Sequence, residues 1–311
     1  MKEIELYSFK GLYCDDFRIM GYEFGYGEKT VCIMGSLRGN EYQQMYACSR
    51  LIAKLKEIEE EGQIKTGKSI MVIPCGNPYS VNTKKRFWGI DNTDINRMFP
   101  GYDKGETTQR IADGIFKKIN DYKYGIQFAS FYMPGYFVPQ VRMMKTGNEN
   151  IELAKKFGLP FVVLHKPRPF DTATLNYNWQ IWETDAFSIY TSSTEKIDKK
   201  SAKQGVNAVL GFLSKEGIID FRELACYDAR VIESEKLVSL RAARAGFLES
   251  LVNAGDSVEK GQILAYITDP YTSEVLQEVI APEDGIIAFE YDSPLAYQNT
   301  ALFKLILDHN C

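Results

Sequence analysis

The sequence predicts an α/β protein with a mostly parallel mixed sheet covered by helices on both faces, followed by a small all-β domain. Over the first 225 residues, apolar segments of strand length alternate with segments of helical periodicity, which is typical of a parallel sheet. After that point helical periodicity stops, and short strands separated by turns take over. We therefore predict two domains, residues 1–225 and residues 226–311.

The elements of the first domain follow in chain order. Residues 4–34 are expected to form short strands broken by glycines. The first long helix is predicted at 40–61, because Met45, Cys48, Leu51 and Leu55 recur at helical spacing. The later expected elements are a strand at 68–73, a loop at 75–105, a helix from Thr107 or Thr108 to about Asp121, a strand at 124–128, a helix at 151–157, a strand at 160–165, a strand near 187–191 and a helix at 198–215.

The second domain is expected to consist of short strands, at 231–232, 237–240, 246–248, 263–267 and 285–289. The stretches G-D-S-V-E-K-G-Q-I-L-A-Y-I and A-P-E-D-G-I-I resemble the barrel-sandwich fold of lipoyl and biotinyl domains. Those carriers need a modifiable lysine in the hairpin between the two halves. Here that hairpin reads T-D-P-Y-T and has no lysine, so the resemblance implies a packing domain and not a swinging arm.

Composition excludes several classes of function. Hydrophobic residues make up 45% of the 311 positions, enough for a large core. The 37 basic and 41 acidic side chains are well mixed and give a net charge of -4, so a nucleic-acid partner is not expected. No segment approaches the roughly 18 apolar residues of a membrane span, and charged residues occupy the start of the chain. We expect a cytoplasmic protein without a membrane partner; a homo-oligomer is compatible with the sequence.

Cysteines and histidines give little support for a metal site. No two cysteines have a Cys-x-x-Cys spacing, which favours buried reduced thiols over a disulfide or a zinc site. Of the two histidines, His165 follows an apolar strand, where it is either a hydrogen-bonded structural residue or a ligand at the sheet edge. His309 is expected to be exposed. The cysteines are Cys14, Cys32, Cys48, Cys75, Cys226 and Cys311.

The stretch G-S-L-R-G-N-E at 35–41 follows an apolar strand and enters a helix, a corner where α/β enzymes often place a metal ligand. Glu41 could hold a metal, whereas the guanidinium of Arg38 could not. A buried carboxylate needs a partner, so we expect an Arg38–Glu41 ion pair. The alternative is an Arg38 that points to solvent.

The loop at 76–101 carries Arg86, Asn96 and Arg97. A guanidinium offers a planar pair of donors that matches a carboxylate, and an asparagine amide adds another donor. These three residues are therefore candidates for a carboxylate-binding site. The competing interpretation of each arginine is a solvated charge or a structural salt bridge.

The segment D-I-N-R-M-F-P-G at 94–101, together with Gly39-Asn40-Glu41, Asn77-Pro78 and Arg86, resembles the succinylglutamate desuccinylase/aspartoacylase family, a branch of the zinc-carboxypeptidase fold. The resemblance runs from about residue 28 to the end of the chain. It implies a zinc-carboxypeptidase-like α/β domain, a C-terminal barrel-like domain, and zinc-dependent hydrolysis of N-acyl amino acids.

The chain departs from the family at the residues that carry the chemistry. The family holds zinc with two histidines and one glutamate, and the matching positions here are Arg38, Glu41 and Ala129. The position of the general-base glutamate is Tyr190, and a tyrosine hydroxyl is a poor base at neutral pH. Glu195 follows five residues later, in the expected loop or helix start. The comparison thus implies no catalytic residue and no zinc, because one carboxylate does not retain it.

We therefore predict a non-catalytic member of the family that binds an acidic small molecule or a peptide carboxylate through Arg86, Asn96 and Arg97. One alternative is an active N-acyl-amino-acid amidohydrolase or carboxypeptidase-like hydrolase with a rearranged metal site. A third is a structural or interaction protein whose pocket is vestigial. Metal content and turnover separate the first two, and carboxylate binding separates the first from the third.

Overall fold

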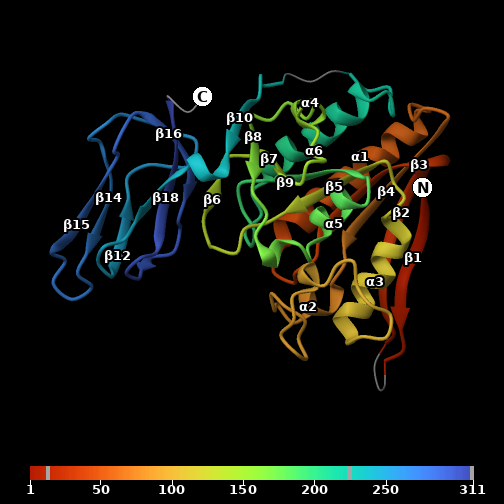
Figure 1. Cartoon of the computed structure of the whole chain (residues 1–311), viewed down its shortest axis with the longest axis horizontal. Helices are drawn as coiled ribbons and strands as arrows, with labels where there is room; N and C mark the ends of the chain where they lie inside the picture. The colour runs from red at the N-terminus through yellow and green to blue at the C-terminus, as the bar shows by residue number, and fades with distance from the viewer. Residues whose placement is uncertain (12–14, 223–225, 309–311) are drawn as a thin grey trace. The chain divides into compact units, whose positions relative to one another are not determined.

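The computed structural model describes residues 1–11, 15–222 and 226–308 and contains two compact units (Figure 1). The first unit consists of Met1–Ser130 and Pro139–Ala229, and the second of Phe131–Val138 and Arg230–Cys311. The sequence predicted two consecutive domains with a boundary at residue 225. The segment Phe131–Val138 departs from that division, because it follows a strand of the first unit but belongs to the second. The expectations for Cys14, His309 and Cys311 concern residues outside the described ranges.

The first unit alternates strands and helices as expected. In it, α2, β7 and α5 are additional to the predicted elements; α2 lies within the stretch predicted as a loop at 75–105. The elements are β1 (Lys2–Phe9), β2 (Phe17–Gly25), β3 (Gly27–Ser36), α1 (Tyr42–Glu60), β4 (Gly67–Cys75), α2 (Pro78–Asn82), a 3₁₀ turn (Ile95–Arg97), α3 (Thr107–Ile119), β5 (Tyr124–Ala129), β7 (Gln140–Met144), α4 (Ile151–Lys155), β8 (Phe161–His165), a 3₁₀ turn (Pro169–Asp171), α5 (Leu175–Ile181), β9 (Asp185–Tyr190) and α6 (Lys199–Lys215).

The strands of the first unit lie in the order β1-β2-β4-β3-β5-β9-β7-β8. The centre is parallel: β3 pairs in parallel with β4 and β5, and β5 with β9. At one side β2 runs antiparallel to β4 and β1, and at the other β7 is antiparallel to β9 but parallel to β8. This confirms the predicted mostly parallel mixed sheet.

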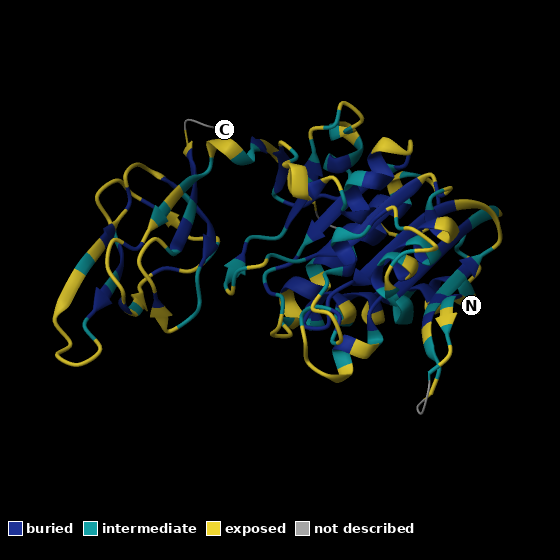
Figure 2. Cartoon of the chain, turned by 60° about the horizontal axis from the view of Figure 1, so that its bottom comes forward, coloured by how far each residue is buried: buried dark blue, intermediate teal, exposed yellow. Residues whose placement is uncertain are grey.

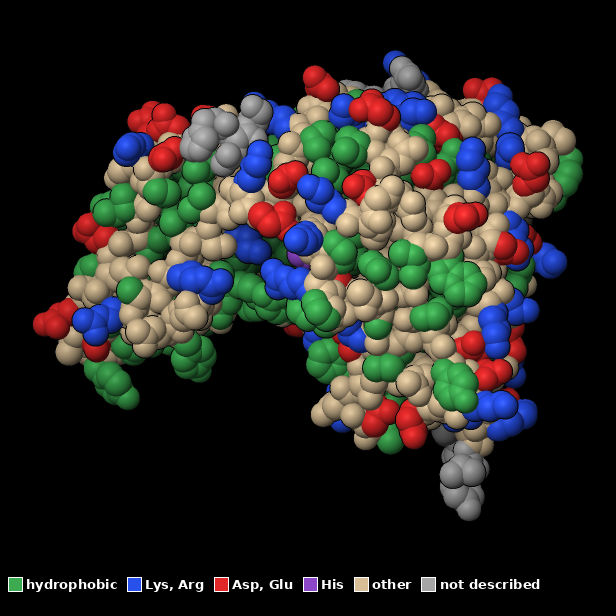
Figure 3. All heavy atoms as spheres, in the orientation of Figure 1, with side chains coloured by type: hydrophobic (Ala, Val, Ile, Leu, Met, Phe, Trp, Pro, Cys, Tyr) green, Lys and Arg blue, Asp and Glu red, His purple; other side chains and the backbone are tan. Residues whose placement is uncertain are grey.

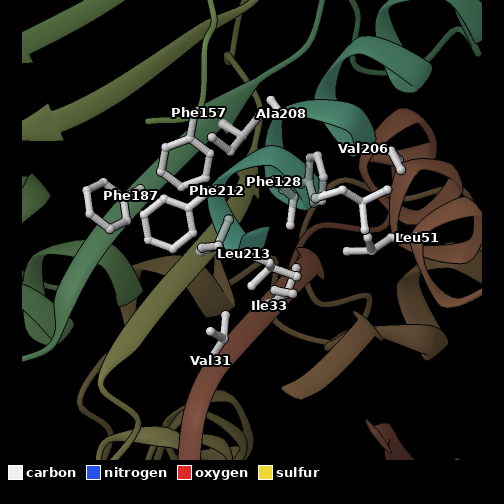
Figure 4. Close-up of a cluster of buried hydrophobic side chains, with 14 of the residues drawn as sticks. Val31, Ile33, Leu51, Phe128, Phe157, Phe187, Val206, Ala208, Phe212 and Leu213 are labelled. Atoms are coloured by element: carbon white, nitrogen blue, oxygen red, sulfur yellow. The ribbon is translucent and has the colours of Figure 1, made fainter. Parts of the chain in front are cut away.

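Strand alternation directs apolar side chains to both faces of this sheet. In β3, Ile33 belongs to the core cluster that contains Phe212 of α6 and residues of α1 (Figure 4). The next residue, Met34, belongs to the opposite cluster, with Ile115 of α3 and residues of α5. The dark-blue interior in Figure 2 follows the sheet and the inner sides of these helices. Helices therefore cover both faces, as the sequence predicted.

The central strands bring their carboxyl ends to one edge of the sheet. The strand β3 ends at Ser36, β5 at Ala129 and β9 at Tyr190. Ala129 is paired directly with Tyr190, and Gln127 with Met34. Loops that follow such strand ends gather at the same edge, which is where ligands bind in open α/β sheets. The residues singled out by the sequence at 38–41, 129 and 190 thus belong to one neighbourhood.

The second unit is all-β, as expected. Its sheets are ordered β11-β18-β16-β13, with β6 paired to β16, and β15-β14-β12-β17. Leu264, Ile267 and Leu305 are among the residues of its own apolar core. The elements are β6 (Tyr136–Phe137), β10 (Arg230–Glu233), a 3₁₀ turn (Ser234–Lys236), β11 (Val238–Arg241), β12 (Gly246–Ser250), β13 (Ser257–Val258), β14 (Ile263–Thr268), β15 (Val275–Ile280), β16 (Gly285–Glu290), β17 (Leu295–Ala296) and β18 (Ala301–Leu307).

Three further observations concern the whole described chain. Of the cysteines in it, Cys32, Cys48 and Cys75 are buried as expected, whereas Cys226 is exposed and the expectation of a buried thiol is wrong for it; none of the four forms a disulfide with another described residue. Within residues 1–11, 15–222 and 226–308, no helix is both long and apolar enough to span a bilayer. On the face drawn in Figure 3, acidic and basic side chains are interspersed.

Candidate functional site

Arg38 and Glu41 form the predicted ion pair in the turn between β3 and α1. The Nη1 atom of Arg38 donates to Oε1 of Glu41 at 3.0 Å, and the side chains are only 8% and 1% exposed. The remaining side of the guanidinium binds a second carboxylate that the sequence did not suggest: Nε and Nη2 donate to Oδ2 of Asp94 at 3.0 and 2.9 Å. The alternative of an Arg38 pointing to solvent is therefore wrong.

Both carboxylate oxygens of Glu41 already have donors. Oε2 accepts from the backbone N–H groups of Leu37 and Arg38, at 2.8 and 3.0 Å. Oε1 accepts from Arg38 and from the Ser130 hydroxyl at 2.5 Å. Burial alone would lower the pKa of Arg38, but the attraction of Glu41 and Asp94 is stronger and raises it above its usual value. The cation at this corner is permanent.

These residues do not fit the donor set of a zinc site. A catalytic zinc takes three protein ligands with free lone pairs, of the imidazole, thiolate or carboxylate kind. Glu41 is bound by four donors, Arg38 brings a positive charge, and Ala129 has only a methyl group. Across the described residues, no three His, Cys, Asp or Glu side chains are grouped as a metal site requires.

Arg86 lies beside the same turn. The backbone N–H of Gly39 donates to the Arg86 carbonyl at 3.1 Å. This close approach needs a glycine, because a Cβ at position 39 would lie 2.2 Å from the Lys85 carbonyl oxygen. The half-buried guanidinium of Arg86 lies over the ring of Phe87, 5.5 Å from its centroid. In the described part of the chain, no carboxylate forms an ion pair with it.

The pKa of Arg86 is lowered from its usual value. Burial and the positive charge of Arg38 lower the pKa of Arg86, and the negative charges of Glu41, Asp94 and Glu195 only partly offset this effect. The guanidinium stays charged, yet it is under-compensated. An incoming anion would relieve that imbalance.

Asn96 and Arg97 make other contacts. Nη1 of Arg97 donates to Oδ1 of Asp171 at 3.0 Å and to the Phe170 carbonyl at 2.5 Å, and its guanidinium lies 5.0 Å from the centroid of the Phe170 ring. Asn96 is buried and its Oδ1 accepts from the backbone N–H of Leu175 at 3.1 Å. Both residues thus attach the 76–101 loop to the segment before and at the start of α5. The three predicted binding residues do not share one set of contacts.

Glu195 reaches the turn from the segment that follows β9. Its Oε1 accepts from Nδ2 of Asn40 at 2.7 Å. Gln44 secures the same segment by donating from Nε2 to the carbonyls of Ala129 and Ser193, at 3.2 and 3.1 Å. The sequence placed Glu195 in a loop without a role, because the turn that returns this loop to Asn40 leaves no local pattern. The carboxylate itself is exposed.

Two other residues considered in the sequence analysis, Tyr190 and His165, end the strands β9 and β8. Tyr190 ends β9 beside Ala129, and its ring lies 5.8 Å from the guanidinium carbon of Arg142. His165 ends β8, and its Nε2 lies 3.1 Å from Oδ2 of Asp171. Burial and the charge of Arg142 lower the pKa of His165, so at neutral pH it is an uncharged, hydrogen-bonded residue. Of the two interpretations left open by the sequence, this geometry favours a hydrogen-bonded structural residue over a ligand at the sheet edge.

Comparisons with known proteins place this geometry in context. The model of the succinylglutamate desuccinylase/aspartoacylase catalytic domain matches residues 27–214. The N-alpha-acetyl-L-2,4-diaminobutyric acid deacetylase of Halomonas elongata is 25% identical in an alignment 280 residues long that covers 83% of this chain and 76% of that protein.

Solved structures show the same fold. A succinylglutamate desuccinylase from Silicibacter sp. TM1040 superposes with a TM-score of 0.79 at 18% identity, covering 97% of this chain and 92% of that one. The product-bound ectoine utilization protein EutE (DoeB) from Ruegeria pomeroyi gives 0.77 at 17% identity, covering 94% and 90%. At these identities the likeness concerns the fold alone.

Proposed function

Since the chain belongs to the succinylglutamate desuccinylase/aspartoacylase family, we propose that it keeps the ligand-binding edge of that family without its hydrolytic chemistry, and binds a carboxylate-bearing small molecule or peptide end. One observation carries the proposal. The half-buried guanidinium of Arg86 forms no ion pair with a carboxylate of the described residues, whereas Glu41 and Asp94, whose charges act on it, are bound to Arg38. An external carboxylate is the natural counter-ion for such a group.

The expected gain is sufficient for specific binding. A hydrogen bond to a charged group contributes roughly 1.5–3 kcal/mol, and a guanidinium can offer two to one carboxylate. Arg38 adds attraction from nearby, although its donors are in use. Asn96 and Arg97 remain candidate contributors, with a smaller share for Arg97 because Asp171 already neutralises it.

The proposed loss of hydrolysis follows from two features, the β3–α1 turn with Arg38 and the residue at the family's general-base position. Arg38 takes the place of a family zinc ligand and engages Glu41, the one remaining ligand, so a zinc-bound water would have no site. Tyr190 stands at the general-base position. No zinc is therefore proposed for this chain.

A second candidate is an active N-acyl-amino-acid amidohydrolase or carboxypeptidase-like hydrolase with a rearranged site. The observation that favours it is Glu195, an exposed carboxylate held by Asn40 beside the same turn. A carboxylate in such a position could act as a base. Turnover of N-acetyl and N-succinyl amino acids by purified protein, with and without added zinc, decides between the two. Sustained turnover that Glu195→Gln removes would overturn the binding-only proposal.

The binding proposal is tested by calorimetry and thermal shift with acetate, succinate and N-acetylglutamate. We expect at least one of these anions to bind and to raise the Tm of the wild-type protein, and Arg86→Gln to lose both effects. Lys85→Gln is the matched control, because Lys85 is an exposed neighbour whose Nζ donates to the Gly89 carbonyl at 3.4 Å and forms no ion pair with a described residue. Absence of binding by all three anions in the wild-type protein favours the vestigial-pocket interpretation.

A second basic surface requires its own control. A groove of about 590 Å³ between α1 and α6 is lined by Arg50, Lys54, Lys199 and Lys203 over apolar side chains, and it could bind anions independently. The double variant Lys199→Gln/Lys203→Gln should leave the carboxylate effect unchanged. Should it remove the effect while Arg86→Gln does not, the anion binds at this groove and the proposal for Arg86 fails.

A further inference from the structure

Two residues of opposite charge are hydrogen-bonded to consecutive residues of the β3–α1 turn, Arg86 through its backbone and Glu195 through its side chain. Arg86 is attached to Gly39 through its backbone carbonyl, at 3.1 Å from the Gly39 nitrogen. Glu195 is attached to the next residue, Asn40, through the 2.7 Å hydrogen bond from Nδ2 to Oε1. Although both residues are bound to this turn, the described structure contains no ion pair between the two side chains. The charge of Glu195 nevertheless acts on Arg86, so a cation and an anion lie within electrostatic range of each other without direct contact.

Each charge retains capacity for a ligand. Arg86 is half-buried and has a ring contact with Phe87 but no carboxylate partner in the described ranges. Glu195 is exposed, and the hydrogen bond from Asn40 occupies only its Oε1. Its second oxygen can accept from a ligand. Arg86 therefore needs an acceptor and Glu195 can take a donor.

The surroundings of Glu195 also favour a donor. Asn40 is 8% exposed, and its Oδ1 is buried without a hydrogen-bond partner in the described structure. The same holds for Oε1 of Gln44, which is 1% exposed. Both side chains contact the segment that carries Glu195, so their buried oxygens add partial negative charge near it without touching a ligand themselves. A negatively charged ligand group would be repelled there, whereas a positively charged nitrogen would be attracted.

We propose that this edge recognises a zwitterion, an amino acid or another carboxylic acid with a free amino group, whose carboxylate binds Arg86 and whose ammonium group binds Glu195. The inference rests on the proposed carboxylate site and adds the charge of the rest of the ligand. Asn40 is a positioning residue, because it holds the Glu195 side chain and does not itself need to touch the ligand. Dicarboxylates of the same length are disfavoured, since their second carboxylate faces Glu195.

The test measures, by titration calorimetry, the affinities of a ladder of ligands: ω-amino acids of increasing length from glycine to 6-aminohexanoate, together with the common α-amino acids. Each is compared with the carboxylic acid that lacks the amino group and with its N-acetyl derivative. We expect at least one amino acid to bind at least 10-fold more tightly than both counterparts. The chain length with the largest preference reports the separation of the two charges.

Variants assign the preference to Glu195. Glu195→Gln keeps an oxygen for Asn40 but removes the charge, so the 10-fold preference should fall to about one while affinity for the simple carboxylate is retained. Glu60→Gln, which removes an exposed carboxylate at the end of α1, should leave the preference unchanged. Arg86→Gln should abolish binding of the whole series.

The outcomes separate this inference from the proposed function. Equal affinity for ligands with and without the amino group, or a preference that survives Glu195→Gln, overturns the zwitterion inference and leaves carboxylate binding intact. Absence of binding by every member of the ladder overturns both.

Discussion

The guanidinium of Arg38 and the carboxylate of Glu41 form a buried ion pair, with Nη1 and Oε1 3.0 Å apart, inside the turn that joins β3 to α1. The same guanidinium binds Asp94 across 56 positions of sequence. One cation therefore compensates two carboxylates at the sheet edge, and it connects the turn to the 76–101 loop that carries Arg86.

Removal of Arg38 should destabilise the protein strongly. Arg38→Met leaves Glu41 fully buried and Asp94 largely buried without a counter-ion, and breaking such a pair costs about 3–5 kcal/mol. We expect a loss of that size in urea denaturation at neutral pH. Arg18→Met is the control: its side chain is 59% exposed and pairs with Glu5 and Asp16 at the surface, so the loss should stay within about 1 kcal/mol. An equal effect of the two variants would refute the structural role of Arg38.

The zinc content of the purified protein should be low. Protein purified without chelators should contain far less than one zinc per chain by elemental analysis, because Arg38 and Ala129 occupy two of the three positions that hold zinc in the family. The double variant Arg38→His/Ala129→His supplies two imidazoles beside Glu41 and should raise the zinc content towards one per chain. Wild-type protein with near-stoichiometric zinc, lost on mutation of Glu41, would contradict the proposal and favour the hydrolase.

The sequence was informative wherever the signal is local. The apolar run Thr30–Met34, the helical spacing after Asn40 and the loss of helical periodicity near residue 225 were enough to predict the α/β unit and the β unit. The Arg38–Glu41 pair followed from two residues three positions apart. These features depend on neighbours in the chain.

Contacts between distant residues were not predictable in the same way. Asn40 and Glu195 are 155 positions apart, and Arg97 and Asp171 are 74 apart. Nothing in the local sequence around Arg97 indicates that an aspartate from the loop after β8 will neutralise it. A joint carboxylate site of Arg86, Asn96 and Arg97 was predicted because the three residues share one loop. In the structure they have different partners, which lie in different segments of the chain.

This separation predicts unequal roles for the two arginines. Arg86→Ala should abolish carboxylate binding with little loss of stability, because Arg86 has no ion pair to lose among the described residues. Arg97→Ala should weaken binding less and destabilise more, since it leaves the buried Asp171 without its guanidinium and removes the contact with Phe170. Calorimetry and urea denaturation of both variants measure the two effects. The reverse order, with Arg97→Ala the more damaging to binding, would restore Arg97 as the principal anchor.

The pH dependence of His165 gives a test that is independent of any ligand. Burial and the positive charges of Arg142 and Arg168 lower its pKa below 6.5, against the opposing effect of Asp171. An NMR titration should therefore show a midpoint below 6.5, and Asp171→Asn should move the midpoint lower still, because it removes a negative charge that favours the imidazolium.

The same shift has a consequence for stability. Between the folded pKa and the unfolded value of about 6.5, the unfolded chain binds more protons at this residue than the folded one. The contribution of neutral His165 is thus fully present above pH 6.5 and decreases as the pH falls towards the folded pKa. His165→Gln cannot titrate, so the stability difference between wild type and this variant should shrink from pH 7.5 to pH 5, as measured by urea denaturation at each pH. A difference that grows on acidification would require a folded pKa above 6.5, and hence a charged His165–Asp171 pair as the dominant interaction.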